Sequence, residues 1–243
     1  MVLSNILSKI KNNKKQLAVL VDPDKQTLRE LSDFINLINK TSVDLIFVGG
    51  SLVNNNIDET ILKIKKNTTL PVIIFPGSLN QISNFADAVL FLSLISGRNP
   101  EFLIGNHVLA AKSIKESKIE VISTGYMLVE NGSMTSVEYM SNTKPIPAKK
   151  TDIAVSTAMA GELLGNKIIY MDSGSGAKHV IFDKMISEVK TNINIPLIIG
   201  GGINTKEKLK SVYTNGADIA VVGTAFEKNN KLLSEFCVIK DSF

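Results

Sequence analysis

The chain has 243 residues, of which 44% are hydrophobic and 21% are charged, a composition typical of a globular protein and not of a disordered one. This length favours a single domain spanning residues 1–243, because α/β barrels run to about 250 residues as one unit. The net charge of +4 comes with scattered lysines and an aromatic content of only 6%, which argues against a nucleic-acid partner.

Short apolar, β-branched runs alternate with helix-length amphipathic stretches along the whole chain. The predicted strands are LAVLVD (17–22), DLIFVGG (44–50), PVIIF (71–75), DAVLFLSL (87–94), IEVISTGYMLV (119–129), KIIYMD (167–172), PLIIGGG (196–202) and DIAVVGT (218–224). The predicted helices lie at 26–40, 52–66, 101–115, 154–164, 177–190 and 206–215, and a last one runs through Phe236. The strands are continuous hydrophobic runs, as expected where both faces of a parallel sheet are covered. The pattern predicts a closed (β/α)₈ TIM barrel rather than an open sheet.

Two segments depart from a regular barrel. Only GSLNQISNF separates the third strand from the fourth, whereas a crossover with a full helix needs at least about 10–12 residues. We therefore expect the third helix to be replaced by a short loose segment. The polar insertion 130–149 follows the fifth strand, and its two prolines, Pro145 and Pro147, disfavour a continuous helix. Such loops at the top of a barrel often act as lids.

Glycine-rich segments follow three of the strands, at the end of the barrel where active sites lie. They are DSGSGAKH (172–179), GGGINT (200–205) and GTAFE (223–227). Glycine lets backbone N–H groups approach an anion closely, and loops after strands seven and eight form the phosphate site of many barrels. Each cluster alone would also suit an ordinary tight turn. Together they predict a phosphate site.

Tyr170 and Asp172 end the sixth strand beside this glycine-rich region. Strand alternation places their side chains on one face and Met171 on the other. A phenol and a carboxylate next to a phosphate could hold the hydroxyl groups of a small polyol. In the alternative interpretation, Asp172 caps the next helix and Tyr170 fills the mouth of the barrel.

The first two strands end in VDPDK (21–25) and GGS (49–51), which offer oxygen ligands for a metal ion. Asp22 stands at the first strand tip, and Ser51 could donate a hydroxyl oxygen to the same ion. Such a pair suits Mg²⁺, which takes one or two protein oxygens plus substrate phosphates. Both residues could equally be helix caps, and Asp24 is expected to cap the first helix after the first strand. One cysteine, Cys237, and two histidines leave little material for a cysteine- or histidine-based metal site.

A set of motifs extends over nearly the whole chain. It comprises LAVLVDPDK, DLIFVGGSLV, VIIFPGS, FLSLISGRNPEFLIGNHVLAA, STGYMLVENG, IIYMDSGSGA, IIGGGI and AVVGTAFE. In this order the motifs resemble the geranylgeranylglyceryl phosphate synthase family, prenyltransferases that join glycerol 1-phosphate to a prenyl diphosphate. The forms VDPDK, GGS and Tyr-x-acid-x-GSGA resemble the second group of this family, with archaeal and some bacterial members. The family fold is a modified TIM barrel whose third helix is a loose segment.

The resemblance implies transfer of a prenyl group, favouring geranylgeranyl, from its diphosphate to the C3 hydroxyl of sn-glycerol 1-phosphate. It implies that Asp22 and Ser51 bind Mg²⁺. For the reaction itself our hypothesis is that Tyr170 and Asp172 are catalytic and hold the reacting hydroxyl, with Asp172 accepting its proton or only its hydrogen bond. The implied glycerol phosphate site comprises Tyr170, Met171, Asp172, Ser173, Gly174, Ser175, Gly176, Gly201, Gly202, Gly223 and Thr224. Asp172 and Ser173 depart from the glutamate and alanine common at these positions in the family.

A prenyl tail requires an apolar trough, since each buried CH₂ contributes roughly 0.8 kcal/mol. The missing third helix would leave such a groove. Candidate lining residues, which could equally be barrel packing, are Phe75, Leu79, Ile82, Phe91, Leu94 and Tyr126. Arg98 could meet the diphosphate or be an exposed loop residue, and His107 is expected to be structural.

Localisation and assembly are expectations from weaker signals. The N-terminus lacks the apolar core and cleavage site of a signal peptide, and a single cysteine suits a reducing compartment, so we expect a cytoplasmic protein. The resemblance implies a homo-oligomer, either a dimer or a hexamer, and the lipid product suggests a peripheral membrane contact. Two other functions stay open: an enzyme acting on a phosphosugar, and a non-catalytic barrel that binds a phosphorylated lipid.

Overall fold

The computed structural model describes all 243 residues and contains a closed barrel of eight parallel strands in sequential order. This confirms the predicted fold class. The strands are β1 (Gln16–Val21), β2 (Leu45–Val48), β3 (Val72–Ile74), β4 (Ala88–Leu94), β5 (Glu120–Leu128), β6 (Ile168–Asp172), β7 (Leu197–Gly200) and β8 (Ile219–Val222). Each strand lies within one or two residues of its predicted bounds.

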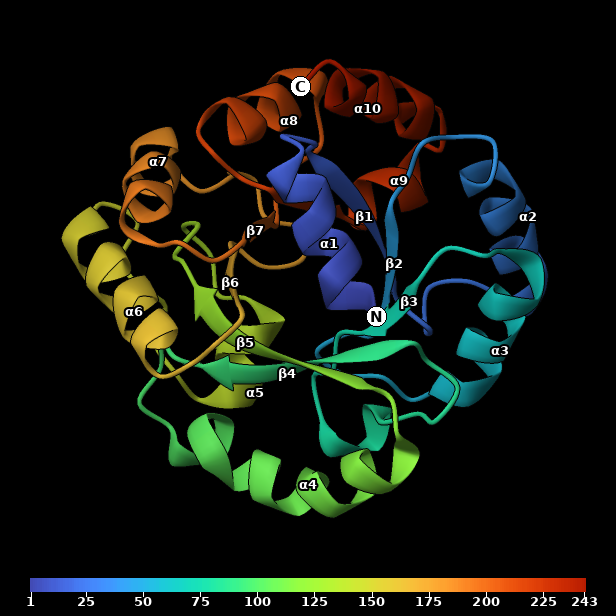
Figure 1. The fold of residues 1–243 in the computed structure, drawn as a ribbon, viewed down its shortest axis with the longest axis horizontal. Helices are drawn as coiled ribbons and strands as arrows, with labels where there is room; N and C mark the ends of the chain where they lie inside the picture. The colour runs from blue at the N-terminus through green and yellow to red at the C-terminus, as the bar shows by residue number, and fades with distance from the viewer.

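Helices surround the barrel except in one sector (Figure 1). The outer ring consists of α2 (Leu28–Ile38), α3 (Ile57–Asn67), α4 (Asn106–Ser117), α6 (Thr151–Leu163), α7 (Asp183–Asn192), α8 (Lys206–Thr214) and α10 (Lys231–Asp241). A π-helical turn, η2 (Glu101–Gly105), leads into α4. Between β3 and β4 the chain forms only the 3₁₀ turn η1 (Leu79–Gln81), so the predicted loss of the third helix is confirmed.

Strand alternation divides the core into two clusters. Inside the barrel, Tyr170 packs with apolar side chains from the other strands, whereas Met171 lies in the larger cluster between the barrel and its helices. This is the period-two pattern expected of strands buried on both faces. It fixes which side chains at the strand tips can reach the mouth of the barrel.

Several predicted helix bounds were wrong, because loops occupy the first residues. Helix α7 begins at Asp183 rather than at residue 177, and α3 begins at Ile57, after the cap residue Asn56, rather than at residue 52. In the loop before α7, Gly174 and Gly176 have φ of +91° and +71°, a region that an α-helix does not use. The last predicted helix is divided into α9 (Thr224–Lys228) and α10.

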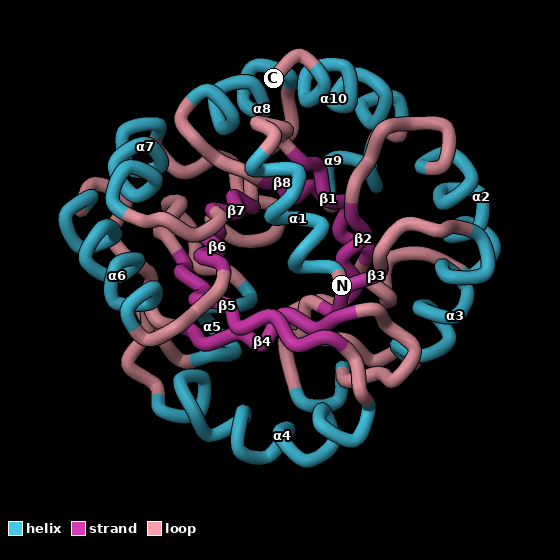
Figure 2. The backbone as a smooth tube through the Cα atoms, viewed as in Figure 1, coloured by secondary structure: helices cyan, strands magenta, loops and turns pink.

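The first helix, α1 (Val2–Lys11), was not predicted. It lies across one end of the barrel in both views (Figures 1 and 2). Ile6 is buried against the interior cluster, and its carbonyl accepts a hydrogen bond from Gln16 Nε2 at the start of β1. The helix therefore closes the barrel at the N-terminal ends of the strands, opposite the glycine-rich loops.

Three aspartates repeat one arrangement at this closed end. Each precedes a strand and accepts the backbone N–H of the preceding strand in the barrel, at 2.8–2.9 Å: Asp44 with Leu17, Asp87 with Val72, and Asp218 with Leu197. Each also forms an ion pair with lysine: Asp44 with Lys9 and Lys240, Asp87 with Lys65, and Asp218 with Lys190. The carboxylates thus join neighbouring strands and anchor the helices that carry the lysines.

No helix has both the length and the hydropathy that crossing a membrane would need.

Candidate active site

A cavity of about 360 Å³ opens at the carboxyl ends of the strands. Most of the predicted site residues line it: Asp22, Ser51, Tyr170, Asp172, Ser175, Gly176, Gly201, Gly202, Gly223 and Thr224. The structure therefore gathers residues from five strand ends into one space. Three predicted residues do not line it, namely Met171, which faces the helices, and Ser173 and Gly174, which lie behind the surface of the loop.

Ser173 and Gly174 serve the loop itself. The carbonyl of Ser173 accepts a hydrogen bond from Asn131 Nδ2, and the N–H of Gly174 donates to Asp172 Oδ1 at 2.7 Å. A Cβ on Gly174 would lie 2.5 Å from the methyl group of Thr135. These contacts make Ser173 and Gly174 supports for the loop that follows β6 rather than parts of the cavity wall.

The glycine-rich loops present unpaired backbone donors on one side of the cavity. The N–H groups of Gly201, Gly202 and Ile203 donate to no oxygen of the protein, and all three residues line the cavity. Gly201 and Gly202 have φ of +80° and +70°, which favours glycine over any residue with a side chain. Adjacent N–H groups of this kind form a ready anion site. We call the loops after β6, β7 and β8 the phosphate cradle.

Tyr126, Tyr170 and Asp172 form a buried group beside the cradle. Tyr126 Oη donates to Asp172 Oδ2 at 2.7 Å, while no group of the protein bonds Tyr170 Oη. Burial raises the pKa of Asp172, although the hydrogen bonds from Tyr126 and Gly174 oppose that rise. Burial also holds the pKa of both phenols well above their usual value. Asp172 can therefore accept a proton, and Tyr170 Oη is free to bind a ligand.

The alternative role of Asp172 as a helix cap is not found. The residue at the cap position of α7 is Phe182, ten positions further along the chain. Tyr126, predicted only as a lining residue of the prenyl trough, is thus also the partner of Asp172. The register pairs Tyr126 with Tyr170 on neighbouring strands, so correct alignment of β5 on β6 would have located it.

Asp22 and Ser51 line the opposite side of the cavity and are not helix caps, since Thr27 and Asn56 cap α2 and α3. Asp22 Oδ1 accepts the N–H of Asp24, and Oδ2 accepts no hydrogen bond from the protein. A Cβ on Gly50 would lie 3.4 Å from this Oδ2, so the glycine leaves the oxygen open. Burial raises the pKa of Asp22. An open, partly desolvated carboxylate and a hydroxyl facing one cavity fit Mg²⁺.

Asp24 does not cap a helix, contrary to the prediction. Its carboxylate accepts the backbone N–H groups of Asn54 and Asn55, each at 2.9 Å, and these hydrogen bonds lower its pKa. It thus joins the loop that carries Asp22 to the loop after Ser51. Lys25, Glu227 and Lys228 also line the cavity and were not singled out from the sequence.

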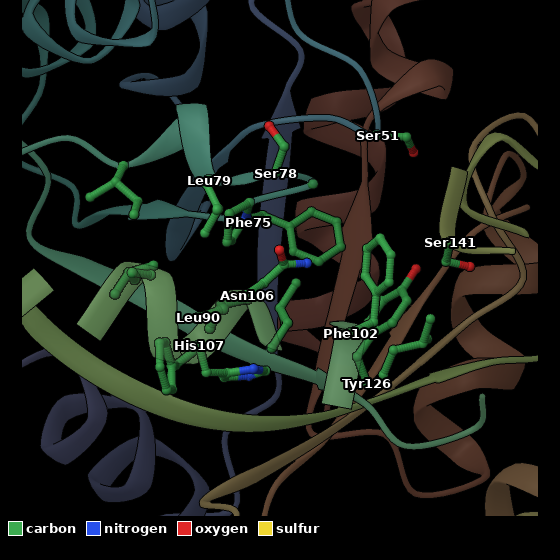
Figure 3. Close-up of a pocket in the computed structure, with 18 of the residues that line it drawn as sticks. Ser51, Phe75, Ser78, Leu79, Leu90, Phe102, Asn106, His107, Tyr126 and Ser141 are labelled. Atoms are coloured by element: carbon green, nitrogen blue, oxygen red, sulfur yellow. The ribbon is translucent and has the colours of Figure 1, made fainter. Parts of the chain in front are cut away.

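A second pocket, of about 130 Å³ and mainly apolar, lies where the third helix is missing. All six residues proposed for a prenyl trough line it: Phe75, Leu79, Ile82, Phe91, Leu94 and Tyr126. Figure 3 shows Phe75, Leu79, Phe102 and Tyr126 around this pocket. Gly50, Ser51, Phe75 and Val137 line both spaces, so the apolar pocket and the polar cavity meet beside Ser51.

Arg98 is the loop residue of the second interpretation rather than a diphosphate contact, and His107 has the structural role expected of it. Arg98 Nη1 donates to carbonyls of its own loop, the closest being Gly97 O at 2.8 Å, and it lines neither cavity. His107 lines the apolar pocket, where its Nε2 lies 3.1 Å from Ser93 Oγ. Burial lowers the pKa of His107, which favours a neutral imidazole.

The insertion 130–149 contains the short helix α5 (Ser136–Ser141). Ser136 and Val137 line the polar cavity, and Val137 and Met140 line the apolar pocket. The insertion therefore lies over the junction of the two spaces, as a lid would.

The sequence profile of the PcrB family matches residues 9–240. The chain belongs to the PcrB family. One relative, the geranylgeranylglyceryl phosphate synthase of Chitinophaga pinensis, is 51% identical over 222 residues, which are 91% of this chain and 88% of that protein. A relative of the same name from Flavobacterium johnsoniae is 48% identical over 226 residues, 93% of each chain. The names of these PcrB relatives confirm the resemblance found in the motifs.

A solved structure supports the same assignment to the PcrB family. The (S)-3-O-geranylgeranylglyceryl phosphate synthase of Thermoplasma acidophilum, in complex with its substrate sn-glycerol-1-phosphate, matches with a TM-score of 0.92 and 35% identity. The match covers 100% of this chain and 98% of that one. The fold is thus shared along nearly the entire length of both chains.

Proposed function

We propose that this protein is a Mg²⁺-dependent prenyltransferase that joins the geranylgeranyl group of geranylgeranyl diphosphate to sn-glycerol 1-phosphate. The observation that carries the proposal is the junction of a polar cavity and an apolar pocket beside Ser51 and Phe75. A polar phosphate ester and a long hydrocarbon need two such spaces, and their reacting ends must meet where the spaces join. The names of the PcrB relatives support the same reaction.

Glycerol phosphate would occupy the polar cavity. Its phosphate would accept hydrogen bonds from the unpaired N–H groups of Gly201, Gly202 and Ile203, with Gly223 and Thr224 on the far side. Its hydroxyls would lie against Tyr170 Oη and the Asp172 carboxylate. This orientation directs the C3 hydroxyl away from the cradle and towards the apolar pocket.

The prenyl diphosphate would extend across the junction. Its tail would lie on the apolar pocket wall, and its diphosphate would lie beside Asp22 and Ser51. Asp22 and Ser51 would hold Mg²⁺ there, and its charge would neutralise the diphosphate and make it a better leaving group. Lys25 lines the same side of the cavity and would add positive charge for the leaving group. Glu227 lines this side as well, and burial raises its pKa.

In the proposed reaction the C3 oxygen of glycerol phosphate forms a bond to C1 of the prenyl chain as the C1–O bond to diphosphate breaks. The bonding electron pair leaves with the diphosphate, and the hydroxyl proton passes to Asp172. Burial raises the pKa of Asp172, which makes this carboxylate a better proton acceptor than an exposed aspartate. Positioning of the two substrates by the cradle and the apolar pocket would supply much of the rate.

The test is incubation with Mg²⁺, sn-glycerol 1-phosphate and radiolabelled geranylgeranyl diphosphate, followed by extraction of the lipid product. We expect an acid-stable ether lipid that requires all three components, and little product from sn-glycerol 3-phosphate as the matched acceptor. Failure with every prenyl length tried would exclude the transferase. Turnover of a short phosphosugar would then indicate another enzyme, and lipid binding without turnover would indicate a binding barrel.

Two features stay predictions from the family resemblance. These are assembly as a dimer or hexamer and a peripheral contact with a membrane that accepts the lipid product.

A further inference from the structure

Lys208 of α8 lies directly behind the phosphate cradle. Its Nζ donates to three oxygens, Lys178 O at 3.0 Å, Gly202 O at 3.2 Å and Asn204 Oδ1 at 2.8 Å. The first belongs to the loop after β6, and the other two belong to the loop after β7. An ammonium group has three N–H donors, so all of them are used, one for each oxygen.

These contacts constrain the peptide groups of the cradle. In a trans peptide the carbonyl and the following N–H point in opposite directions. A carbonyl held by Lys208 therefore directs the next N–H away from Lys208. For Gly202 this is the N–H of Ile203, which lines the cavity and has no acceptor in the protein.

The two loops are also pressed together at this point. A Cβ on Gly202 would lie only 2.6 Å from the carbonyl oxygen of His179, so no side chain fits between the loops. Lys208 connects the same two loops, since it donates hydrogen bonds to Lys178 O on one loop and to Gly202 O on the other. One ammonium group thus contacts both loops and holds the direction of the Gly202–Ile203 peptide.

Lys208 also has no carboxylate within ion-pair distance. It forms no ion pair, unlike Lys206 on the same helix, which lies 3.2 Å from Glu235 of α10. All of its partners are neutral oxygens. Its charge is therefore not cancelled locally and adds to the positive potential of the cradle.

We propose that Lys208 is a positioning residue for the phosphate of the acceptor: it orients the N–H of Ile203 in the cradle, holds the loops after β6 and β7 together and places a positive charge behind them. This inference rests on the proposed function only in that the cradle receives the phosphate of sn-glycerol 1-phosphate. It assigns Lys208 no contact with the substrate.

The test compares Lys208→Met with Lys206→Met, which removes the same charge from the same helix. Calorimetry with sn-glycerol 1-phosphate should show binding about 10-fold weaker for Lys208→Met, because hydrogen bonds to a charged group are lost from the cradle. Lys206→Met should bind as the wild type does. In turnover assays the KM for glycerol phosphate should rise in Lys208→Met, while the KM for prenyl diphosphate should change less than about 2-fold. Lys208→Arg, which retains the charge and the donors, should recover part of the affinity.

Two results would overturn the inference. One is unchanged glycerol phosphate affinity in folded Lys208→Met, even with a lowered melting temperature, because that would make the lysine a stabiliser of α8 alone. The other is an equal rise in KM for glycerol phosphate and for prenyl diphosphate. If Lys208→Met does not fold, the same comparison is made with Lys208→Arg and Lys208→Gln, which should then differ in glycerol phosphate affinity. Failure of the wild type to bind glycerol phosphate would instead contradict the proposed function.

Discussion

Tyr126 Oη donates a hydrogen bond to Asp172 Oδ2 at 2.7 Å, between neighbouring strands β5 and β6. The ring of the same tyrosine lines the apolar pocket, 5.9 Å from the ring of Phe75. Tyr126 thus contacts the proposed tail site with its ring and the proposed proton acceptor with its hydroxyl. The position of the tail and the basicity of Asp172 are linked through one side chain.

Tyr126→Phe separates these two roles. The ring stays, so the KM for prenyl diphosphate should change little. Loss of the hydroxyl removes a hydrogen bond that lowers the pKa of Asp172, so that pKa should rise further. The acid limb of the kcat/KM profile should therefore move to higher pH. An unshifted acid limb would remove Asp172 from the role of proton acceptor.

Asp172→Asn should nearly abolish transfer, by at least about 100-fold, because an amide cannot accept the proton. It should also stabilise the protein. Burial raises the pKa of Asp172, so the ionised carboxylate costs free energy in the folded state at any pH above that pKa. The variant should melt at a higher temperature than the wild type at neutral pH. This difference should shrink as the pH falls through the raised pKa, and a variant that melts lower at neutral pH would contradict the argument.

Tyr170→Phe should weaken glycerol phosphate more than prenyl diphosphate. Its hydroxyl has no partner within the protein, so the substitution disrupts no internal hydrogen bond, and the ring still stacks on Phe75 at 5.1 Å. We expect a roughly 10-fold higher KM for glycerol phosphate, as for loss of one good hydrogen bond. Steady-state kinetics in which each substrate is varied separately measure the difference. Equal effects on both KM values would place the hydroxyl elsewhere.

Asp22→Asn should remove Mg²⁺-dependent turnover while leaving the fold intact. Asp22 Oδ2 has no hydrogen-bond partner in the protein, so the neutral amide can replace it without breaking a contact. Binding of Mn²⁺, followed by its electron paramagnetic resonance signal in the presence of a prenyl diphosphate analogue, should weaken about 10-fold or more. The circular dichroism spectrum should be unchanged. Substantial residual turnover would show that Asp22 is not a required ligand of Mg²⁺.

Asp218→Ala tests the strand linkage at the closed end of the barrel. Asp218 accepts Leu197 N at 2.8 Å and Lys190 Nζ at 2.6 Å, and its side chain is only 7% exposed. Removing the carboxylate leaves both donors unpaired, so the free energy of unfolding measured in urea should fall by about 3–5 kcal/mol. Asp87→Ala is the matched control, because Asp87 bonds Val72 N and Lys65 in the same way but is 34% exposed. Asp87→Ala should lower the free energy of unfolding by about 1–2 kcal/mol. Equal losses in the two variants would show that burial of the carboxylate does not determine the cost.

The sequence predicted the barrel and most of the cavity wall, because both follow from short-range rules. Continuous apolar runs locate the strands, and residues after a strand end must reach the mouth of the barrel. Asp22, Tyr170 and the cradle glycines were found in this way. The missing third helix was predicted from loop length alone.

What sequence did not predict depends on register and on loop conformation. Tyr126 contacts Asp172 because the register of β5 on β6 pairs Tyr126 with Tyr170. The sequence of either strand alone does not determine this register. Asp24 looked like a helix cap, yet it bonds the N–H groups of a loop 30 residues away. Glu227 was passed over because the strand pattern ends before it, and only the turn into α9 brings it to the cavity.

The absent helix between β3 and β4 also affects how this enzyme could diversify. The outer wall of the proposed tail pocket, with Leu79 of η1 and Ala110 and Ile114 of α4, stands outside the barrel, whereas the phosphate cradle and the carboxylates stand at the strand tips. Substitutions in the outer wall can therefore alter the size of the lipid that fits without disturbing the groups proposed to make the ether bond. Away from the junction, where Tyr126 contacts both sites, donor length and acceptor chemistry can therefore evolve at different rates.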